Sequence, residues 1–257
     1  MPCYRDLVPE KVAIVTGGGT GIGKASALAL ARDGFSVVIS GRRPDPLEKT
    51  VTEGASERLA LTAVAGDLSA AAGVSALFEH VERRFRRLDV LFNNAGRLAP
   101  PAELDEIPEE DWRGVMDACV TTAFLCTQAA VRLMKKQQPG GGRIINNGSV
   151  SAHVPRPLSA PYTAAKHAIT GLTKSTSLDG RRFNIACSQI DIGNAATTSA
   201  SWLGTEALQA DGSLRPEPMM DVQIAARAVA HIAGLPLEAN VQFMTIMATA
   251  MPYIGRG

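Results

Sequence analysis

Two side chains with complementary acid–base chemistry lie four residues apart in the segment SAPYTAAKHAITGL. Tyr162 and Lys166 would share one face of a helix, because residues four apart lie one turn above each other. A phenol has a reference pKa of about 10, so work as a base near neutral pH needs a shift of about three units, or about 4 kcal/mol. An ammonium about 5 Å away supplies about 3 kcal/mol at an effective dielectric constant of about 20. The pair could therefore exchange protons with a substrate, although a surface helix with an aromatic–aliphatic contact has the same spacing.

A second candidate is the glycine-rich segment TGGGTGIG (Thr16–Gly23), which follows the first apolar segment and opens a helical pattern. A helix N-terminus offers free N–H groups and a positive dipole end, and glycines let a pyrophosphate approach the backbone. We therefore predict a dinucleotide site at Gly17, Gly21 and Gly23, with tight packing of the turn as the alternative. The segment lacks the Gly-Lys-Ser/Thr of a P-loop, which argues against ATP hydrolysis.

These residues need a framework, and the chain alternates short apolar segments with longer amphipathic ones. Buried strands are predicted at 11–17, 35–40, 59–67, 88–96, 142–149 and 183–192, each closed by Gly, Asn, Asp or Ser or ending before Gly. Helices are predicted at 21–34, 46–54, 69–85, 109–137 and 160–178. Strands that alternate with helices predict an α/β fold, with a parallel sheet covered on both faces.

The sequence shows neither internal repeats nor interdomain linkers, so residues 1–257 are predicted to form a single domain. Residues 193–220 form the one long segment with weak periodicity. A long irregular insertion in a compact domain is usually a lid or a binding loop, so we expect a lid there, near the C-terminal third.

The chain resembles the short-chain dehydrogenase/reductase family over nearly its whole length, from Lys11 onward. The resemblance rests on Thr16–Gly23, Asp67 after the third predicted strand, Asn93-Asn-Ala-Gly96 after the fourth, and Tyr162-x-x-x-Lys166. In the family a serine precedes the tyrosine by the spacing seen here, 162 − 149 = 13, which selects Ser149 over Ser151. The resemblance implies a Rossmann-type doubly wound sheet and an oxidoreductase that interconverts a carbonyl and a secondary alcohol.

For catalysis, the resemblance implies that Tyr162 donates the proton that an alkoxide needs after hydride transfer. Lys166, together with the positive charge of an oxidised nicotinamide, would hold the phenol partly ionised, and in the family this lysine also hydrogen-bonds the nicotinamide ribose. Ser149, at the carboxyl end of a predicted strand, would orient the substrate oxygen; otherwise it is a turn serine. Ser149, Tyr162 and Lys166 are therefore the expected catalytic residues.

The resemblance also implies a set of cofactor-binding residues. Asn93 would contact the adenosine ribose and fix the sheet, Asp67 would reach the adenine or cap the following helix, and Thr197 would hold the nicotinamide carboxamide. The family has a proline-glycine pair after the sixth strand, whereas this chain has Ile192-Gly193. This difference leaves open the angle at which the lid leaves the sheet. The full expected set is Gly17, Gly19, Thr20, Gly21, Ile22, Gly23, Arg42, Arg43, Asp67, Leu68, Asn93, Ala95, Gly96, Lys166, Ile192 and Thr197.

The segment VVISGRRPDPLE bears on the choice of nicotinamide cofactor. An acidic residue after the second strand would bind the ribose 2′-hydroxyl of NAD, but Gly41 stands there and Arg42 and Arg43 follow. Guanidinium groups match a phosphate bidentately, so we predict NADP rather than NAD. Two solvated loop arginines are the alternative; Asp45 lies near, and Thr20 replaces the basic residue that often precedes Gly21 in NADP-dependent relatives.

Cys119 departs from the family pattern, in which an asparagine at this position supports a water-mediated proton relay from the lysine. A packing substitution, a weakened relay and lost catalysis are all open at this point. Nothing else in the sequence suggests a reactive thiol. The alternative function is therefore a catalytically weak or inactive NADP-binding regulator or sensor.

The substrate is expected between Ser149, Tyr162, the loop 152–157, residues 98–101 and the lid. Trp202, Leu203, Met219 and Met220 suggest an apolar pocket, although such residues more often pack in cores. Arg156 and His153 could contact a polar substituent of the substrate, but we expect both to face solvent because they lie in a loop. The sequence does not identify the substrate or the preferred direction.

Composition excludes several other classes. The chain has 26 basic and 25 acidic residues, so it has no large net charge that would attract nucleic acid or an anionic membrane. Its four cysteines and four histidines show no metal-ligand spacing, and no apolar run approaches the ~18 residues of a membrane span. We expect a cytoplasmic enzyme without metal. A homotetramer or homodimer built on helices 121–137 and 160–178 is expected, and the apolar tail 241–255 also needs cover.

Overall fold

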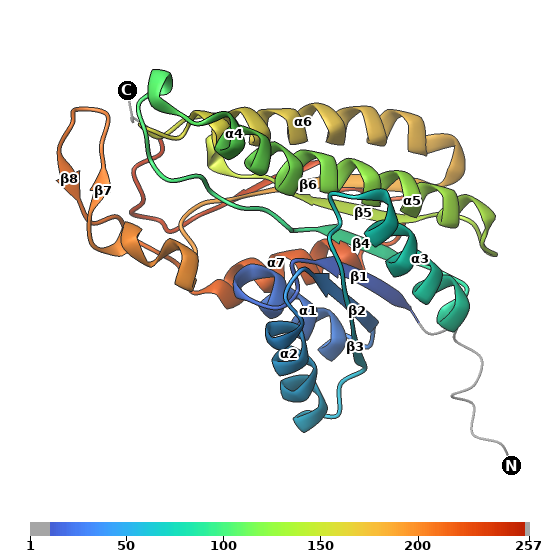
Figure 1. The fold of residues 1–257 in the computed structure, drawn as a ribbon. Coiled ribbons are helices and arrows are strands. Elements are labelled where there is room, and N and C mark those ends of the chain that lie inside the picture. Colours follow the sequence, from blue (N-terminus) through green and yellow to red (C-terminus); the bar gives the residue numbers. More distant parts are fainter. Residues whose placement is uncertain (1–10, 255–257) are drawn as a thin grey trace, which may run out of the picture.

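A computed structural model describes residues 11–254 of the chain (Figure 1). Residues 1–10, with Cys3, and the last residue of the apolar tail at position 255 lie outside the described part. Seven strands form one sheet: β1 (Val12–Thr16), β2 (Ser36–Gly41), β3 (Leu61–Ala65), β4 (Val90–Asn93), β5 (Gly142–Asn147), β6 (Ile185–Ile192) and β9 (Phe243–Ile246). Each of the six predicted strands is present.

All neighbouring strands of this sheet run parallel, in the order β3-β2-β1-β4-β5-β6-β9. The strand order reverses beside β1, where Val15 lies level with Ile39 of β2 on one side and with Phe92 of β4 on the other. The chain leaves β1 and β4 toward opposite faces, which opens a crevice at their carboxyl ends. The predicted doubly wound, Rossmann-type sheet is confirmed.

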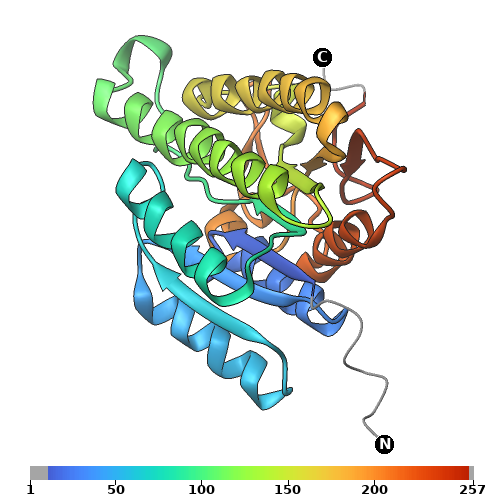
Figure 2. The same ribbon diagram turned by 90° about the vertical axis from the view of Figure 1, so that its right-hand side faces the viewer.

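Helices cover both faces of the sheet (Figures 1 and 2). One face carries α1 (Gly21–Arg32), α2 (Pro44–Ser56) and α7 (Val222–Gly234), and the other carries α3 (Ala71–Phe85), α4 (Glu109–Met116), α5 (Thr122–Lys136) and α6 (Ala160–Gly180). Because side chains alternate along a strand, Ala13 and Val15 pack toward α1 and α7, while Val12 and Ile14 pack toward α3 and α5. Strands β1, β2, β4, β5 and β6 are buried on both faces, as predicted. The prediction of a buried strand at 59–67 was wrong in its burial, because β3 lies at the sheet edge and exposes Ala63 and Ala65.

The structure also contains elements that the sequence interpretation missed. No helix or strand was predicted after residue 220, yet α7 packs along α1, and β9 pairs with β6. The interpretation of residues 241–255 as a tail beyond the last strand was therefore wrong for Phe243–Ile246. This strand lies at the sheet edge, and alternate side chains along it are exposed. It therefore lacks the long apolar run of a buried strand, and only its pairing with β6 identifies it.

A buried arginine ties the end of α7 to the sheet. The Arg143 side chain from β5 donates to Asn240 Oδ1 and to the carbonyl oxygens of Leu235, Pro236 and Ala239. These carbonyls follow the C-terminus of α7, where a cation is favoured by the helix dipole. Burial lowers the pKa of this guanidinium. Arg143 therefore fixes the last crossover, which leads from α7 to β9.

The predicted helix 109–137 is one continuous helical run with a wider turn inside it. A π-helical turn, Asp117–Thr121, joins α4 to α5, and the Thr122 N–H donates to the Asp117 carbonyl five residues back. The run Glu109–Lys136 is long enough for a membrane span, and an 18-residue window within it has a mean hydropathy of 1.3. However, it packs against α3 and α6 and contributes Cys126, Ala130, Leu133 and Met134 to the core.

Residues 193–220 contain little regular structure. They form a 3-10 helix, Thr198–Gly204, and a two-stranded hairpin of β7 (Ala207–Leu208) and β8 (Leu214–Arg215), which extends away from the sheet at the left of Figure 1. The segment returns to the body where Ala195 pairs with Met220, directly before α7. We call residues 193–220 the flap segment.

Candidate active site

One large cavity opens at the carboxyl ends of the strands, beside the reversal of strand order, and has a volume of about 1630 Å³. Its lining combines the glycine-rich turn after β1, the ends of β2 to β6, the start of α6 and the flap segment. Two regions can be separated. The cofactor half lies against residues 17–23, 41–47 and 66–69, and the substrate half against residues 97–101, 150–162 and 194–214.

The glycine-rich turn is shaped by two requirements. Gly17 has a φ of 67°, a left-handed conformation that side chains disfavour. Gly23 is needed for a different reason, because a Cβ there would clash with the Gly17 carbonyl oxygen and with the Asn94 side chain. The absence of a side chain at Gly23 thus serves the packing of the turn itself, and the open backbone at Gly17, Gly19 and Gly21 lines the cavity.

The two adjacent asparagines after β4 point to opposite sides. Asn93 donates to Thr127 Oγ1 and Asn146 Oδ1, each at 2.9 Å, and is buried between the sheet and α5. Asn94 lines the cavity, donates to the carbonyl oxygens of Thr16 and Gly17, and accepts from Asn147 Nδ2 at 3.0 Å. The expected ribose contact of the Asn93 side chain is therefore corrected: Asn93 fixes the sheet, and Asn94 faces the cavity.

Asp67 and the two arginines lie around the far end of the cofactor half. Asp67 accepts from the Ser69 hydroxyl at 2.7 Å and from the Ser69 N–H at 3.0 Å, and these bonds, with the Arg42 charge nearby, lower its pKa. Helix α3 begins only at Ala71, so Asp67 forms a turn and does not cap the helix. Arg42 and Arg43 are exposed, line the cavity, and form no ion pair within residues 11–254.

Ser149 lies two residues after the end of β5 and directly before a single 3-10 turn, Val150–Ala152. Its hydroxyl accepts from the Ser151 N–H at 3.1 Å, which leaves the hydroxyl proton to point elsewhere. The buried carboxylate of Asp191, 1% exposed, accepts from the Ser149 N–H at 3.0 Å and contacts His153 Nε2 at 2.9 Å. Asp191 therefore holds the turn that carries Ser149 at both of its ends.

Tyr162 and Lys166 lie in the first two turns of α6, and both line the cavity. The Lys166 ammonium is 5.3 Å from the centre of the Tyr162 ring. It donates to the Asn147 carbonyl at 2.7 Å, and its side chain is 4% exposed. An ammonium has three N–H groups, so within the described residues two remain for a bound ligand.

Cys119 lies inside the π-helical turn and is buried against Val115 and Ala165. Its thiol donates weakly to the Arg97 carbonyl at 3.7 Å. In a π-helical turn the N–H groups donate to carbonyls five residues back instead of four, as Thr122 does to Asp117. The side chain packs like a core residue, whereas the backbone around it is irregular.

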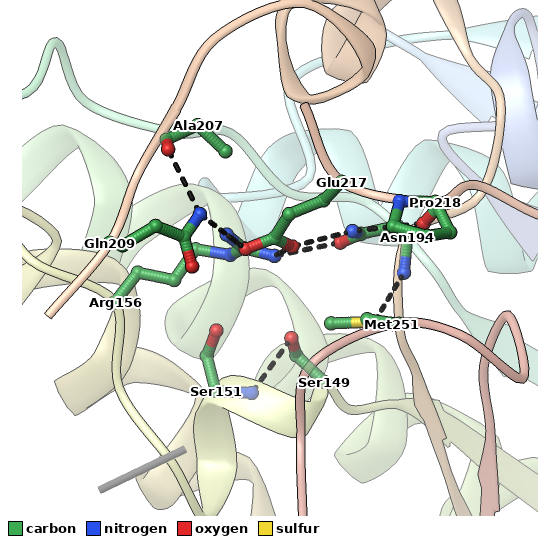
Figure 3. A network of polar contacts seen from close by, with 9 residues as sticks. All are labelled: Ser149, Ser151, Arg156, Asn194, Ala207, Gln209, Glu217, Pro218 and Met251. Atoms are coloured by element: carbon green, nitrogen blue, oxygen red, sulfur yellow. Dashed lines mark hydrogen bonds and ion pairs between the residues drawn. The ribbon is translucent and has the colours of Figure 1, made fainter. Parts of the chain in front are cut away.

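Arg156 and Glu217 form an ion pair at the edge of the substrate half (Figure 3). Both Arg156 amino groups donate to the Glu217 carboxylate, and Arg156 Nη2 also donates to Asn194 Oδ1 at 2.9 Å. Burial alone would raise the pKa of Glu217, but hydrogen bonds from Arg156, Asn194 and Gln209 and the Arg156 charge lower it to about 2. The expectation that Arg156 faces solvent was wrong, because its side chain is 13% exposed.

The structure gathers nearly all expected site residues around this cavity. All expected catalytic residues and all expected cofactor-binding residues except Asn93 line it. Of the expected apolar pocket residues, Trp202 and Leu203 line it, whereas Met220 packs in the core with Val229. Asn94 and Asn147 were missed as lining residues. The NNAG segment carried a signal for Asn94, since neighbouring strand residues face opposite ways.

Comparisons with known proteins agree with this geometry. The family described as short chain dehydrogenase matches residues 11–206. A 3beta-hydroxysteroid dehydrogenase of Mediterraneibacter gnavus is 36% identical over 188 residues, which cover 70% of this chain and 64% of that protein. The match thus spans slightly less than two thirds of that relative's length.

Two solved structures share the architecture closely. An acetoin dehydrogenase, YohF, from Salmonella typhimurium is 35% identical, with a TM-score of 0.78 over 92% of this chain and 95% of that chain. An actinorhodin polyketide ketoreductase crystallised with NADPH is 25% identical, with a TM-score of 0.82 over the same shares. The substrates named for these three proteins differ widely, so similarity alone does not assign one here.

Proposed function

The chain belongs to the short-chain dehydrogenase family, and from this membership we propose that it interconverts a carbonyl and a secondary alcohol with NADP(H). One observation carries the proposal: a single cavity is lined by Ser149, Tyr162 and Lys166 and also by an open glycine-rich turn. A proton donor, a cation beside it and a phosphate-binding turn are what this chemistry requires.

The residues present fit a dinucleotide. The turn from Gly17 to Gly23 directs a helix N-terminus at the cavity, and no side chain from Gly17, Gly19 or Gly21 fills the space. At the end of β2, Arg42 and Arg43 form no ion pair with a described acidic residue, although Arg42 lies near enough to Asp67 to help lower the pKa of that carboxyl. Such guanidinium groups suit a 2′-phosphate, which supports NADP over NAD. The bound nicotinamide would supply or accept the hydride.

Each catalytic side chain has a defined task in the proposed reaction. The Ser149 hydroxyl, whose oxygen already accepts from the Ser151 N–H, donates a hydrogen bond to the substrate oxygen and orients it. Tyr162 gives a proton to that oxygen during reduction, or removes it during oxidation. Lys166, fixed by the Asn147 carbonyl, stabilises the phenolate and offers its other N–H groups to the nicotinamide ribose.

Turnover of a panel of ketones and secondary alcohols, followed by NADPH or NADP absorbance, tests the proposal. Tyr162→Phe should abolish turnover with little change in NADPH affinity, because it removes the proton donor only. Lys166→Met should reduce both, since the lysine has two tasks. Wild-type rates in Tyr162→Phe would exclude the mechanism. No turnover on any compound would favour the alternative, a protein that binds NADP without catalysis.

Three further properties are proposed together with this activity. Residues 1–257 act as one catalytic domain, with residues 193–220 as a lid over the substrate half. The protein works in the cytoplasm on a small-molecule substrate, without nucleic acid, membrane or metal. It assembles as a homotetramer or a homodimer.

A further inference from the structure

We propose that Glu217 makes the substrate half of the cavity selective for uncharged carbonyl compounds, because it occupies Arg156. The inference rests on the proposed function and deepens it, since it names the class of substrate. In Figure 3, Arg156 lies above the turn that carries Ser149 and Ser151, and Glu217 approaches it from the flap segment.

The basic side chains of the two cavity halves differ in their partners. In the cofactor half, Arg42 and Arg43 are without an ion pair in the described chain. In the substrate half, the described basic side chains of residues 97–101, 150–162 and 194–214 that line the cavity are Arg97 and Arg156. Arg97 is paired with Asp111 at 2.8 Å, and Arg156 is paired with Glu217. Apart from Lys166, which the proposed function assigns to Tyr162 and the nicotinamide ribose, the cavity thus offers unpaired cations to the cofactor and paired ones to the substrate.

Burial and further hydrogen bonds hold the ion pair between Arg156 and Glu217 together. Glu217 is 1% exposed, and its carboxylate also accepts from Asn194 Nδ2 at 2.8 Å and from Gln209 Nε2 at 3.1 Å. A substrate carboxylate that approached Arg156 would have to displace this buried carboxylate, which would then lose its main partner and remain desolvated. Such a displacement is costly, so an anionic substrate gains little at Arg156.

The rest of the substrate half also favours a neutral ligand. Its lining includes many apolar side chains, among them Leu98, Val150, Leu158, Trp202, Leu203 and Leu208. Glu206, an exposed acid, lines the same half and repels anions. A carbonyl compound with apolar substituents therefore matches this surface, whereas a keto acid would leave its charge without a partner.

The test compares two ketones that differ by one charge, 4-acetylbenzoate and methyl 4-acetylbenzoate. For each enzyme the ratio of kcat/KM, acid over ester, is measured with NADPH. The wild type should prefer the ester by tenfold or more. Glu217→Gln keeps the shape and frees the Arg156 charge, so its ratio should rise by about tenfold or more, the scale of one charge-assisted hydrogen bond. Adding Arg156→Met to Glu217→Gln should remove that gain.

Glu206→Gln is the matched control, because it removes one negative charge from the same half without releasing an arginine. Its ratio should rise less than that of Glu217→Gln. An equal rise in both variants, or no rise in Glu217→Gln, would overturn the inference. The ratio itself cancels any general loss of activity in a variant.

A binding measurement separates this inference from the proposed function. The dissociation constants of both compounds for the NADPH-loaded wild type are measured by calorimetry, which needs no turnover. Tighter binding of the ester by tenfold or more supports the inference even if neither ketone is reduced. Equal affinities would overturn it, whereas a lack of turnover with every ketone would count against the proposed function alone.

Discussion

Asp191 is the buried residue whose contacts bear most directly on the proposed catalytic serine. Its carboxylate accepts from the Ser149 N–H and from Gln189 Nε2 and contacts His153 Nε2, so three donors converge on two oxygens. A Cβ at Gly148 would clash with Asp191 Oδ1, which shows how closely the β5 end is packed on it. Asp191 is therefore a positioning residue for Ser149.

Asp191→Asn should lower kcat about 10- to 100-fold and change the NADPH dissociation constant less than about twofold, because an amide NH₂ would face one of the three donors. In a Ser149→Ala background the same substitution should add little, since Asp191 acts through Ser149. Steady-state kinetics of the four proteins measure this coupling. Fully additive losses would mean that Asp191 acts elsewhere.

Asp89→Asn provides a matched control for this experiment. Asp89 also accepts from a backbone N–H, that of Val12 at 2.8 Å, but at the opposite end of the sheet. This substitution should lower the melting temperature and leave kcat close to that of the wild type.

At the residue scale, we expect Arg42 and Arg43 to decide the cofactor preference. NADPH should bind about tenfold more tightly than NADH, because a charged contact to phosphate is worth about 1.5–3 kcal/mol. Replacing both arginines by alanine should remove the difference by weakening NADPH alone. Titrations of both cofactors measure it. Equal dissociation constants in the wild type would refute the assignment, and raised salt should narrow the difference.

At the scale of elements, the π-helical turn between α4 and α5 is the feature that most concerns catalysis. Cys119 fills the position of the family's asparagine, and its thiol is a poor hydrogen-bonding group. The family's relay uses the main-chain carbonyl at this position, which a cysteine side chain leaves in place. We therefore expect a slowed enzyme rather than an inactive one.

Cys119→Asn should raise kcat by up to about tenfold, or about 1.4 kcal/mol of barrier, with little effect on cofactor binding. The gain should appear in kcat and in its pH profile if proton transfer limits the rate. Cys126→Ser, on the same helical run but in the core, serves as a control and should lower stability only. An unchanged kcat in folded Cys119→Asn would show that the relay does not limit turnover.

The attachment of the flap segment to the rest of the protein should depend on pH. The pKa of Glu217 is about 2 in the folded protein, against an ordinary value of 4.5. The ionised carboxylate therefore contributes its full stabilisation of the attached flap segment above pH 4.5, and this stabilisation is lost as the pH falls toward 2. Fluorescence of Trp202, read in a Trp112→Phe background, should report detachment in this window. Glu217→Gln should show no such transition there. A wild-type signal that is flat down to pH 2 would contradict the prediction.

At the scale of the whole molecule, the outer surfaces of α5 and α6 carry apolar side chains. Phe124 is 48% exposed on α5 and Leu178 is 62% exposed on α6. We expect a homotetramer or homodimer with this surface buried, so light scattering at micromolar concentration should give two or four times 27.0 kDa. Phe124→Asp should lower the mass. A monomeric wild type would exclude the prediction.

The sequence by itself determined the order of strands and helices as far as β6, and the turns that line the cavity. Local patterns sufficed for this, because a run such as VAIVT fixes a buried strand and a following glycine-rich turn needs left-handed backbone at Gly17. The Tyr162–Lys166 pair was also local, since four residues in a helix bring two side chains together.

Only the tertiary structure decided which side chains far apart in the sequence contact each other. It turned Asn93 into the sheet and Asn94 into the cavity, paired Arg156 with Glu217 sixty-one residues away, and made Phe243–Ile246 a strand by placing it beside β6. Long-range contacts of this kind depend on how finished elements pack. An arginine in a loop has the same local sequence signal whether it faces solvent or a buried carboxylate, so its partner becomes visible only in the folded chain.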